Sequence, residues 1–293
     1  MPKREFIQVP IRSIRQNDNT LNSSFSIEHI KEDENADKVV VPAHRHDFYH
    51  IMFIKQGTGT NIIDFKTYNV QPNTLFFISP GQVHSIELSA NVKGYVISFN
   101  SEFYLLNDTI QKLLDFPFFH SFSNAPVAYL NESNIKIQAV FDELYEEYKT
   151  NSDKNMLRAL LELLLLRAAR LYTKTPTKET PAYLTYQIRK LEALIDTHFK
   201  QYRVLNDYAE LMHISPKHLN SLVKKGLNKT VKNLIHERLL IEAKRLLLFT
   251  NNSISEIAYE LGFTDKSYFM RFFKKQTSIT AETYRNQHKP TSV

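Results

Sequence analysis

Apolar residues near the carboxyl end of the chain recur at the spacing of a helix with one buried side. In the segment 265–275, Phe269, Phe272 and Phe273 fall at positions i, i+3 and i+4, so they share one face. The opposite face carries polar and basic side chains together with one methionine: Lys266, Ser267, Met270, Arg271 and Lys274. The pattern predicts a helix that packs on its aromatic side and exposes a basic side.

A second helix is predicted immediately before this one. Ser253 and Glu256 have the spacing of a capping box, which marks a helix start. Gly262 is suited to end that helix because glycine adopts positive φ without strain. Ala258 is small enough to let the two helices approach closely. The two predicted helices form a helix-turn-helix unit at about 254–275.

The same pattern occurs 50 positions earlier in the chain. Leu219, Leu222 and Val223 match the three phenylalanines, Ser215 matches Asp265, and the pair Lys224 and Lys225 matches Lys274 and Lys275. Ala209 matches Ala258 one residue out of step, which predicts a longer turn in the second unit. The first unit is predicted at about 204–225, and a tandem repeat of this kind is a specific signal.

A long helix is predicted between the two units. Apolar residues keep a helical period through 231–249, and 19 residues at the helical rise span about 28 Å. Neighbouring major grooves on one side of a DNA duplex lie roughly 34 Å apart. A connecting helix of this length is suited to place both basic helices on one side of a duplex.

The first hundred residues show a different pattern, in which short apolar segments alternate with turns. The turns at 57–59, 71–73 and 79–81 are rich in glycine and proline. The predicted strands lie at 49–54, 61–65, 75–78, 86–88 and 95–99. Many short strands with regular turns are typical of an all-β barrel or sandwich.

Two helices are predicted after the strands. One apolar stripe consists of Ile137, Val140, Phe141, Leu144, Tyr145 and Tyr148. The segment 156–172 forms a second helix that is apolar on more than one face. Such a helix is either buried on several sides or forms a dimer seam, and the sequence leaves both interpretations open. We expect 116–120 to be an apolar loop packed on the barrel, and 173–181 to be a linker because it holds two prolines and no apolar residue.

Composition narrows the class of protein. The chain has no cysteine, which excludes disulfides and thiolate metal sites. No apolar stretch typical of a signal peptide or a membrane span occurs, so we expect a cytoplasmic protein without a membrane partner. From Ala182 onward there are 18 lysines and arginines against 10 aspartates and glutamates, whereas the residues before it hold 19 against 21. The positive charge therefore lies with the helix-turn-helix repeat, as phosphate binding requires.

At motif level, about 191–285 resembles the AraC/XylS family of bacterial transcription regulators. The residues that carry the resemblance are Ile257-Ala258, Gly262-Phe263, Ser267-Tyr268-Phe269, Arg271, Phe273-Lys274-Lys275 and Tyr284-Arg285. The chain departs from the family pattern at Asn228, Ser278 and Ala281. The resemblance implies a regulator that is not an enzyme, needs no cofactor, binds double-stranded DNA and forms a homodimer, with RNA polymerase as a possible further partner.

Together, the pattern and the resemblance predict a multidomain chain: an all-β barrel followed by an α-helical pair, and then an all-α domain. We expect a cupin-like effector-sensing barrel at 1–130, a helical pair at 131–172 that is a possible dimerisation element, a linker at 173–182, and a DNA-binding domain at 183–288. The sequence does not establish whether the regulator activates or represses transcription.

The two recognition helices supply the predicted DNA contacts. Arg271 suits a bidentate contact to guanine, Asn220 a similar contact to adenine, and Met270 a thymine methyl group. Lysines at the helix ends suit phosphate, which sets register but not sequence. The full predicted set is Lys217, His218, Asn220, Ser221, Lys224, Lys225, Lys266, Ser267, Met270, Arg271, Lys274 and Lys275.

Four histidines in the predicted barrel resemble the cupin signature: His44, His46, His50 and His84. His50 stands where metal-binding cupins usually have glutamate. The resemblance to AraC regulators implies that these residues line an effector site, and alternation puts the first three on one strand face if that strand is unbroken. The alternative is a four-histidine metal site, in a metal-dependent cupin enzyme or a metal sensor. A DNA-binding protein with an empty barrel is a third possibility.

Overall fold

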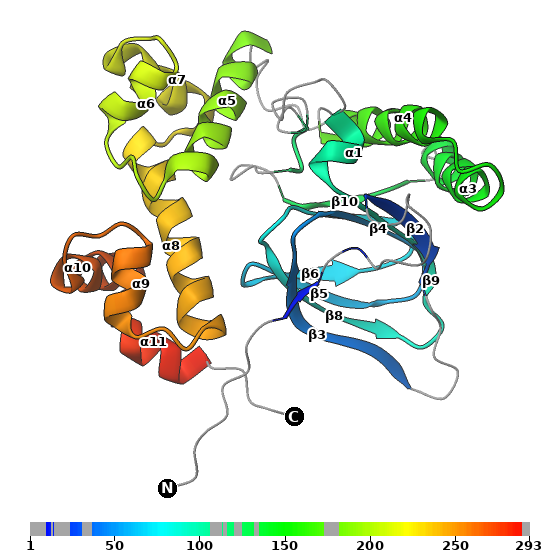
Figure 1. Cartoon of the computed structure of the whole chain (residues 1–293), viewed down its shortest axis with the longest axis horizontal. Helices are drawn as coiled ribbons and strands as arrows, with labels where there is room; N and C mark the ends of the chain where they lie inside the picture. The colour runs from blue at the N-terminus through cyan, green and yellow to red at the C-terminus, as the bar shows by residue number, and fades with distance from the viewer. Residues whose placement is uncertain are drawn as a thin grey trace, which may run out of the picture. The chain divides into compact units, whose positions relative to one another are not determined.

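The computed structural model describes residues 10–12, 14, 24–30, 37–105, 113, 116–119, 125–131, 135–172 and 182–288. The chain divides into two compact units, one within 10–180 and the other within 181–293. The first unit holds all the described strands, and the second is entirely helical in its described part (Figure 1). The predicted linker at 173–181 lies outside the described residues.

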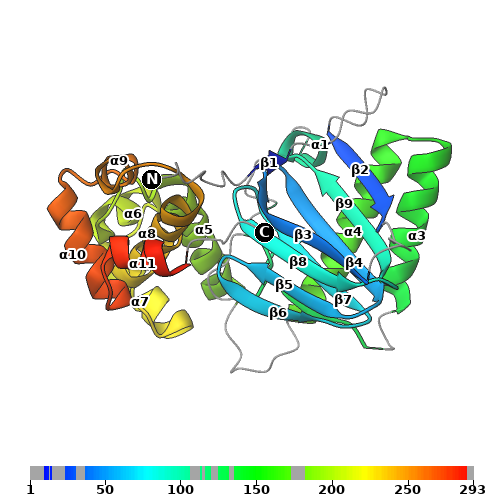
Figure 2. The same cartoon turned by 90° about the horizontal axis from the view of Figure 1, so that it is seen from below.

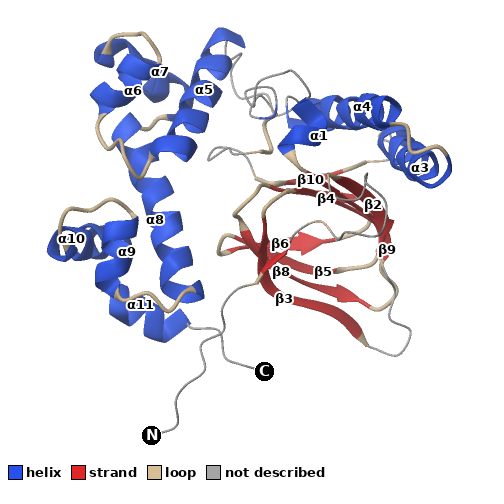
Figure 3. Cartoon of the chain, in the orientation of Figure 1, coloured by secondary structure: helices blue, strands red, loops and turns tan. Residues whose placement is uncertain are grey.

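Two five-stranded sheets form the first unit (Figure 3). The first sheet has the order β1 (Ile11–Arg12), β3 (Lys38–His46), β8 (Val83–Ser89), β5 (Gly59–Ile63) and β6 (Lys66–Val70). The second has the order β10 (Val127–Tyr129), β7 (Thr74–Ile78), β4 (Tyr49–Gln56), β9 (Lys93–Phe99) and β2 (Phe25–His29). Only the β1–β3 pair is parallel among the described strand pairs.

The second sheet is buried on both faces. Met52 and Ile54 of β4 pack with residues of the first sheet, whereas Ile51 and Phe53 pack with the helices that follow. Figure 2 shows these layers, with the helices on the outer side of the second sheet. Because neither face meets water, β4 and β7 are continuous apolar runs instead of alternating ones.

The described part of this unit contains the helices α1 (Ser101–Leu105), α3 (Ile135–Thr150) and α4 (Lys154–Tyr172). The predicted stripe of α3 is confirmed, because four of its six residues are buried and Tyr145 and Tyr148 pack partly buried against the same core. In α4, Leu161, Leu164 and Leu165 are buried, whereas Leu166 is 48% exposed. Burial therefore explains most of the apolar run in α4. The loop residues 116–119 pack on the same core, as predicted, and position 120 lies outside the described residues.

All five predicted strands are present, with shifted ends. The segment predicted at 61–65 ends at Ile63 because Asp64 and Phe65 turn the chain with φ of 46° and 71°. The five predicted strands did not include β1, β3, β6 or β10. β1 and β10 have only two and three residues, and β6 is largely exposed.

Seven helices make up the described part of the second unit: α5 (Ala182–His198), α6 (Leu205–Leu211), α7 (Pro216–Leu227), α8 (Val231–Phe249), α9 (Ile254–Glu260), α10 (Lys266–Thr277) and α11 (Ala281–His288). The predicted helix 231–249 is confirmed at both ends. It contacts helices before and after it in the chain, and in Figure 1 it runs between the two groups. None of the helices in the described part of the chain has both the length and the apolar character needed to cross a membrane.

Candidate nucleic-acid interface and histidine cluster

The two predicted recognition helices, α7 and α10, are built in the same way. Ser215 Oγ accepts a hydrogen bond from the backbone N–H of His218 at 3.2 Å and caps α7. Asp265 Oδ1 accepts from the backbone N–H groups of Ser267 and Tyr268 at 2.6 and 3.0 Å and caps α10. The three predicted apolar positions of each helix are buried, which confirms the two-faced pattern.

The repeat is longer than its sequence pattern indicated. Asn228 and Ser278 end the two recognition helices with left-handed backbone, at φ of 54° and 67°. The threonine hydroxyls two residues later, at Thr230 and Thr280, accept from the backbone N–H of Asn233 and Thr283 and so start α8 and α11. Ser278 thus occupies the left-handed conformation, which glycine adopts without strain.

The turns inside both units match the prediction. The capping box of Ser253 and Glu256 is present, and Gly262 follows α9 with φ of 75°. Ala209 and Ala258 are buried between their helices. The turn between α9 and α10 is one residue longer than that between α6 and α7.

Most of the predicted DNA-contacting side chains are exposed together on α7 and α10. The exposed residues are Lys217, His218, Ser221, Lys224, Lys225, Lys266, Ser267, Met270, Arg271, Lys274 and Lys275. Asn220 differs, because it is half-buried and its Oδ1 accepts from the backbone N–H of Val231 at 3.3 Å. Its acceptor therefore holds the first residue of α8, and the bidentate contact of Asn220 with adenine stays a prediction.

Tyr268 is an exposed aromatic residue that the sequence prediction did not include among the contacts. Its side chain is 51% exposed on α10, and its ring meets the edge of the Phe263 ring. The repeat itself contained the signal, because Tyr268 stands 50 positions after His218, a residue that was included.

Arg203 connects the two helix-turn-helix units directly. Its backbone N–H donates to the Asp207 carboxylate at the start of α6, in the first unit. Its guanidinium donates to the Leu261 carbonyl in the turn of the second unit and lies 3.9 Å from the centre of the Phe263 ring. A planar cation that both stacks and donates holds two surfaces in one geometry. The units therefore have a second connection besides α8.

The turn of the second unit also packs closely on the chain after α5. A Cβ atom at Gly262 would lie 2.1 Å from the Lys200 carbonyl oxygen, so only glycine fits at this approach. Farther along, Arg285 of α11 donates to the carbonyls of Leu247 and Asn252 at 2.9 and 2.7 Å. These contacts fix α9 and α11 against α8.

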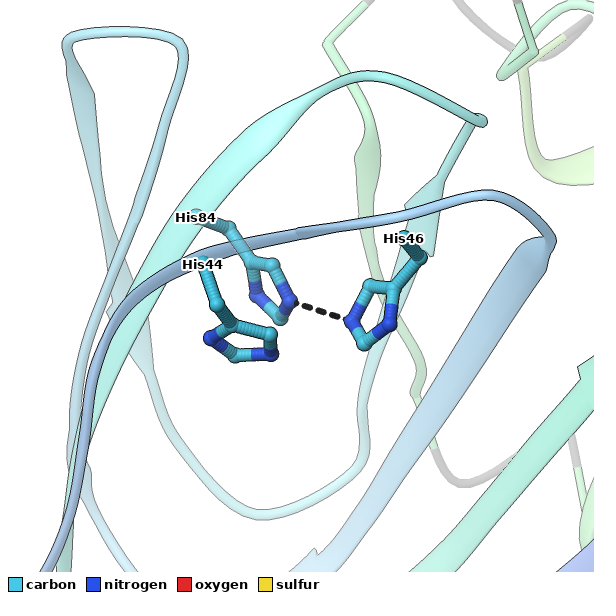
Figure 4. A group of neighbouring side chains, drawn as sticks. All are labelled: His44, His46 and His84. Atoms are coloured by element: carbon cyan, nitrogen blue, oxygen red, sulfur yellow. Dashed lines mark hydrogen bonds between the residues drawn. The ribbon is translucent and has the colours of Figure 1, made fainter. Parts of the chain in front are cut away.

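In the barrel unit, three of the four predicted histidines converge (Figure 4). His44 and His46 lie two residues apart on β3, and His84 lies opposite His44 on β8. One ring nitrogen from each lies within 4.8 Å of the others, and Nε2 of His46 is 2.8 Å from Nε2 of His84. The predicted shared face of His44 and His46 is confirmed.

His50 reaches the cluster by a different route from the predicted one. The chain turns at Asp47 and Phe48, so His50 lies on β4 in the opposite sheet, and the condition for a face shared with His44 and His46, an unbroken strand, is not met. Its ring stacks on that of His46 with centres 4.7 Å apart, and its Nδ1 lies 3.2 Å from Ser98 Oγ. It borders the group of three without joining it.

Burial keeps these imidazoles neutral. It lowers the pKa of His46 to about 2 and that of His50 to about 3, and the nearby charges of other histidines and of Arg12 act in the same direction. Burial also lowers the pKa of His44 and takes that of His84 well below its ordinary value. At neutral pH every ring of the cluster therefore keeps one nitrogen lone pair.

Asn61 is a second polar feature of the barrel interior, which the sequence prediction missed. Its side chain is fully buried, and both its amide nitrogen and its oxygen have no hydrogen-bond partner. It lies on β5 beside Ile63, which pairs with His84. Buried polar groups are normally paired, so an unpaired amide next to the cluster favours a site for a ligand. The signal was a polar residue at an inward position of an alternating strand.

Comparison with known proteins agrees with both units. The family model for an AraC-like ligand binding domain matches residues 27–168, and a helix-turn-helix domain model matches 208–287. The chain belongs to the AraC family of transcription regulators. The HTH-type transcriptional activator RhaR of Mannheimia succiniciproducens is 25% identical over 253 residues, covering 84% of this chain and 87% of that protein. RhaS of an Enterobacter species is 24% identical over 246 residues, covering 83% and 87%.

Among solved structures, the C-terminal domain of AraT from Geobacillus stearothermophilus is 29% identical, covering 36% of this chain and 88% of that domain with a TM-score of 0.35. The two family models show that this AraC-family chain is a transcription regulator with a helix-turn-helix DNA-binding domain and an amino-terminal ligand-binding domain. Its curated relatives are regulators, a class of protein that is not enzymatic.

Replacing Arg203 by alanine should weaken the connection between the two helix-turn-helix units. We expect the free energy of unfolding of the helical unit to fall by about 2 kcal/mol, because a charged hydrogen bond and a cation–π contact are lost. Urea denaturation followed by far-UV circular dichroism measures this. Lys232→Ala, at an exposed position of α8, is the control. Equal stability of the two variants would show that the connection does not hold the units together.

The buried histidines should make the barrel unit sensitive to acid. The unfolded chain binds protons at these histidines below about pH 6.5, whereas the folded barrel keeps them neutral, so stability present above pH 6.5 is lost as the pH falls. With chelator present, we expect a loss of about 1 kcal/mol per pH unit for each histidine near pH 5. His46→Gln should reduce the slope and the exposed His29→Gln should not. A slope that is the same in all three proteins would contradict this account.

Proposed function

We propose that the helical unit binds one face of a DNA duplex, with α7 and α10 in neighbouring major grooves. The observation that carries this proposal is the repeat. Two capped helices, one before and one after α8 in the chain, each have a buried apolar face and an exposed basic face. The connecting helix has 19 residues, which span about 28 Å. That length is close to the roughly 34 Å between neighbouring major grooves.

Within this arrangement, Arg271 reads a guanine and Met270 contacts a thymine methyl group. The planar guanidinium of Arg271 fits the two acceptors of guanine, and the side chain is exposed on the face opposite the phenylalanines. Lys217, His218, Ser221, Lys266 and Ser267 complete the groove-facing set. Lys224, Lys225, Lys274 and Lys275 lie at the last turns of their helices and bind phosphate. Tyr268 joins the contact surface beside them.

The barrel unit holds the effector at His44, His46, His50 and His84, with Asn61 next to them. The unpaired amide of Asn61 and the neutral imidazoles supply both donors and acceptors in an otherwise apolar interior. A ligand bound here acts as a switch only if it favours one arrangement of the chain over another. On this proposal the protein needs no catalytic group and is not an enzyme.

We also propose that the protein is a homodimer, joined through α4. Met156 and Leu166 are 51% and 48% exposed, and Leu163 between them is only partly buried. Positions i, i+7 and i+10 lie along one side of a helix. The relatives RhaR and RhaS are named activators, which supports activation through RNA polymerase. A regulator acts where its DNA lies, which supports a cytoplasmic location.

Arg271→Ala should reduce affinity for a selected DNA site by about 1–3 kcal/mol and relax the preference at one base pair. Lys274→Ala should instead weaken binding to all DNA sequences alike. It should also reduce the slope of log affinity against log salt concentration by about one, because one phosphate contact is lost. Fluorescence anisotropy with site variants at several salt concentrations separates the two effects. Lys154→Ala, exposed at the start of α4, is the control. An unchanged base preference in Arg271→Ala would exclude Arg271 as a base-reading residue.

Leu166→Glu should convert the dimer to a monomer, because it places a charge in the proposed apolar seam. Light scattering coupled to size-exclusion chromatography measures the mass directly. Val40→Glu changes another exposed apolar residue, on β3, and should leave the dimer intact. A monomeric wild-type chain, or a Leu166→Glu variant that remains dimeric, would rule out this seam.

A further inference from the structure

We propose that His44, His46 and His84 bind one divalent transition-metal ion inside the barrel, and that this ion is the effector of the regulator or the group that holds it. The metal site itself stands on the geometry of the cluster. Its regulatory role rests on the proposed function, because it assumes that the occupied barrel controls the helical unit.

The spacing of the three rings suits an ion. Metal–nitrogen bonds of about 2.0–2.1 Å place two ligand nitrogens roughly 3 to 3.4 Å apart. The cluster has its three ligand atoms within 4.8 Å of one another, and the two Nε2 atoms of His46 and His84 are 2.8 Å apart (Figure 4). Small rotations of the side chains therefore bring three nitrogens to one point.

The backbone already orients His44 as a ligand. Its Nδ1 donates to the Pro42 carbonyl at 2.9 Å, which leaves the lone pair on Nε2. That carbonyl is available because the pairing of β3 with β8 shifts between Val41 and His44. Metal-binding histidines commonly donate their second nitrogen to a carbonyl or carboxylate in this way.

The other two rings are incompletely satisfied without a further partner. His46 and His84 bond to each other, yet Nδ1 of each is buried and has no hydrogen-bond partner. One neutral ring donates and the other accepts in that pair, so one buried Nδ1–H and one buried Nδ1 lone pair remain without a partner. Coordination of one ion by both rings replaces this pairing and offsets the cost of burying them.

Close packing of the rings favours an ion over an organic molecule at this point. The ring centres of His44, His46 and His84 lie 4.3 to 5.0 Å apart, which is van der Waals contact. An organic molecule has no space between them, whereas an ion needs only the gap between ligand atoms. His50 stacks on His46 from the opposite sheet, so an ion that recruits it would link the two sheets.

The donor set also predicts which ions bind. Among the described residues, the cluster contains imidazoles and no carboxylate. Imidazole nitrogen suits zinc, copper, nickel and iron, whereas magnesium, calcium and manganese prefer oxygen. We therefore expect Zn²⁺, Ni²⁺ and Co²⁺ to bind and Mg²⁺ to compete poorly.

The test is a titration of untagged, chelator-treated full-length protein with Co²⁺ and Zn²⁺, followed by visible absorption and calorimetry. We expect one equivalent per chain. His46→Gln and His84→Gln should each weaken binding by more than about 100-fold, since even loss of a partner that only orients a ligand costs 10–100-fold. His29→Gln, an exposed histidine of the same unit, should bind like the wild type.

Absence of a stoichiometric ion in the wild type, or equal binding by all variants, would overturn the inference. If a glutamine variant does not fold, the Cu²⁺ electron paramagnetic resonance spectrum of the wild type decides, because three bound imidazoles produce nitrogen hyperfine coupling and its absence excludes the site. DNA affinity of the same metal-free protein separates the two proposals. A chain that binds duplex but no ion overturns only the metal inference, whereas a chain that binds neither overturns both.

Discussion

The helical unit depends on the rigid relation between two helix-turn-helix units that share one helix. Each unit has helices in contact with α8, and the side chains of Arg203 and Arg285 add directed hydrogen bonds between segments far apart in the chain. The length of α8 sets the distance between α7 and α10. It does not prevent one helix-turn-helix unit from rotating or tilting relative to the other, which requires further contacts between them. The contact of Arg203 with Leu261 and Phe263 supplies that restraint between the first unit and the second.

The barrel unit follows from a different constraint, which is a sheet buried on both faces. The apolar strands β4 and β7 separate two cores, one against the helices and one against the first sheet. Polar side chains are costly in such an interior unless they have partners. The histidine cluster and Asn61 are therefore the part of the barrel that packing does not explain, and their unpaired nitrogens point to ligand binding.

Local signals predicted most of the helical unit and little of the contacts between its parts. The ends of α8, the capping box at Ser253 and the turn at Gly262 follow from residues close in sequence. The Arg203 contact joins residues 58 positions apart, and no nearby pattern marks it. In the same way, the sequence motif predicted that His44, His46 and His84 lie together. It did not predict that a short turn before β4 places His50 in the other sheet. Whether an exposed residue touches DNA depends on the partner, so the contact set stays a prediction.

The central claim is that α7 and α10 bind two neighbouring grooves as one rigid body. The most direct measurement is the affinity of the full-length chain for a selected duplex in which base pairs are inserted between the segments that the two helices recognise. An insertion of about five base pairs rotates one segment by half a turn. The account predicts that affinity then falls to that of a duplex with one segment scrambled. Equal affinity at every spacing would contradict it.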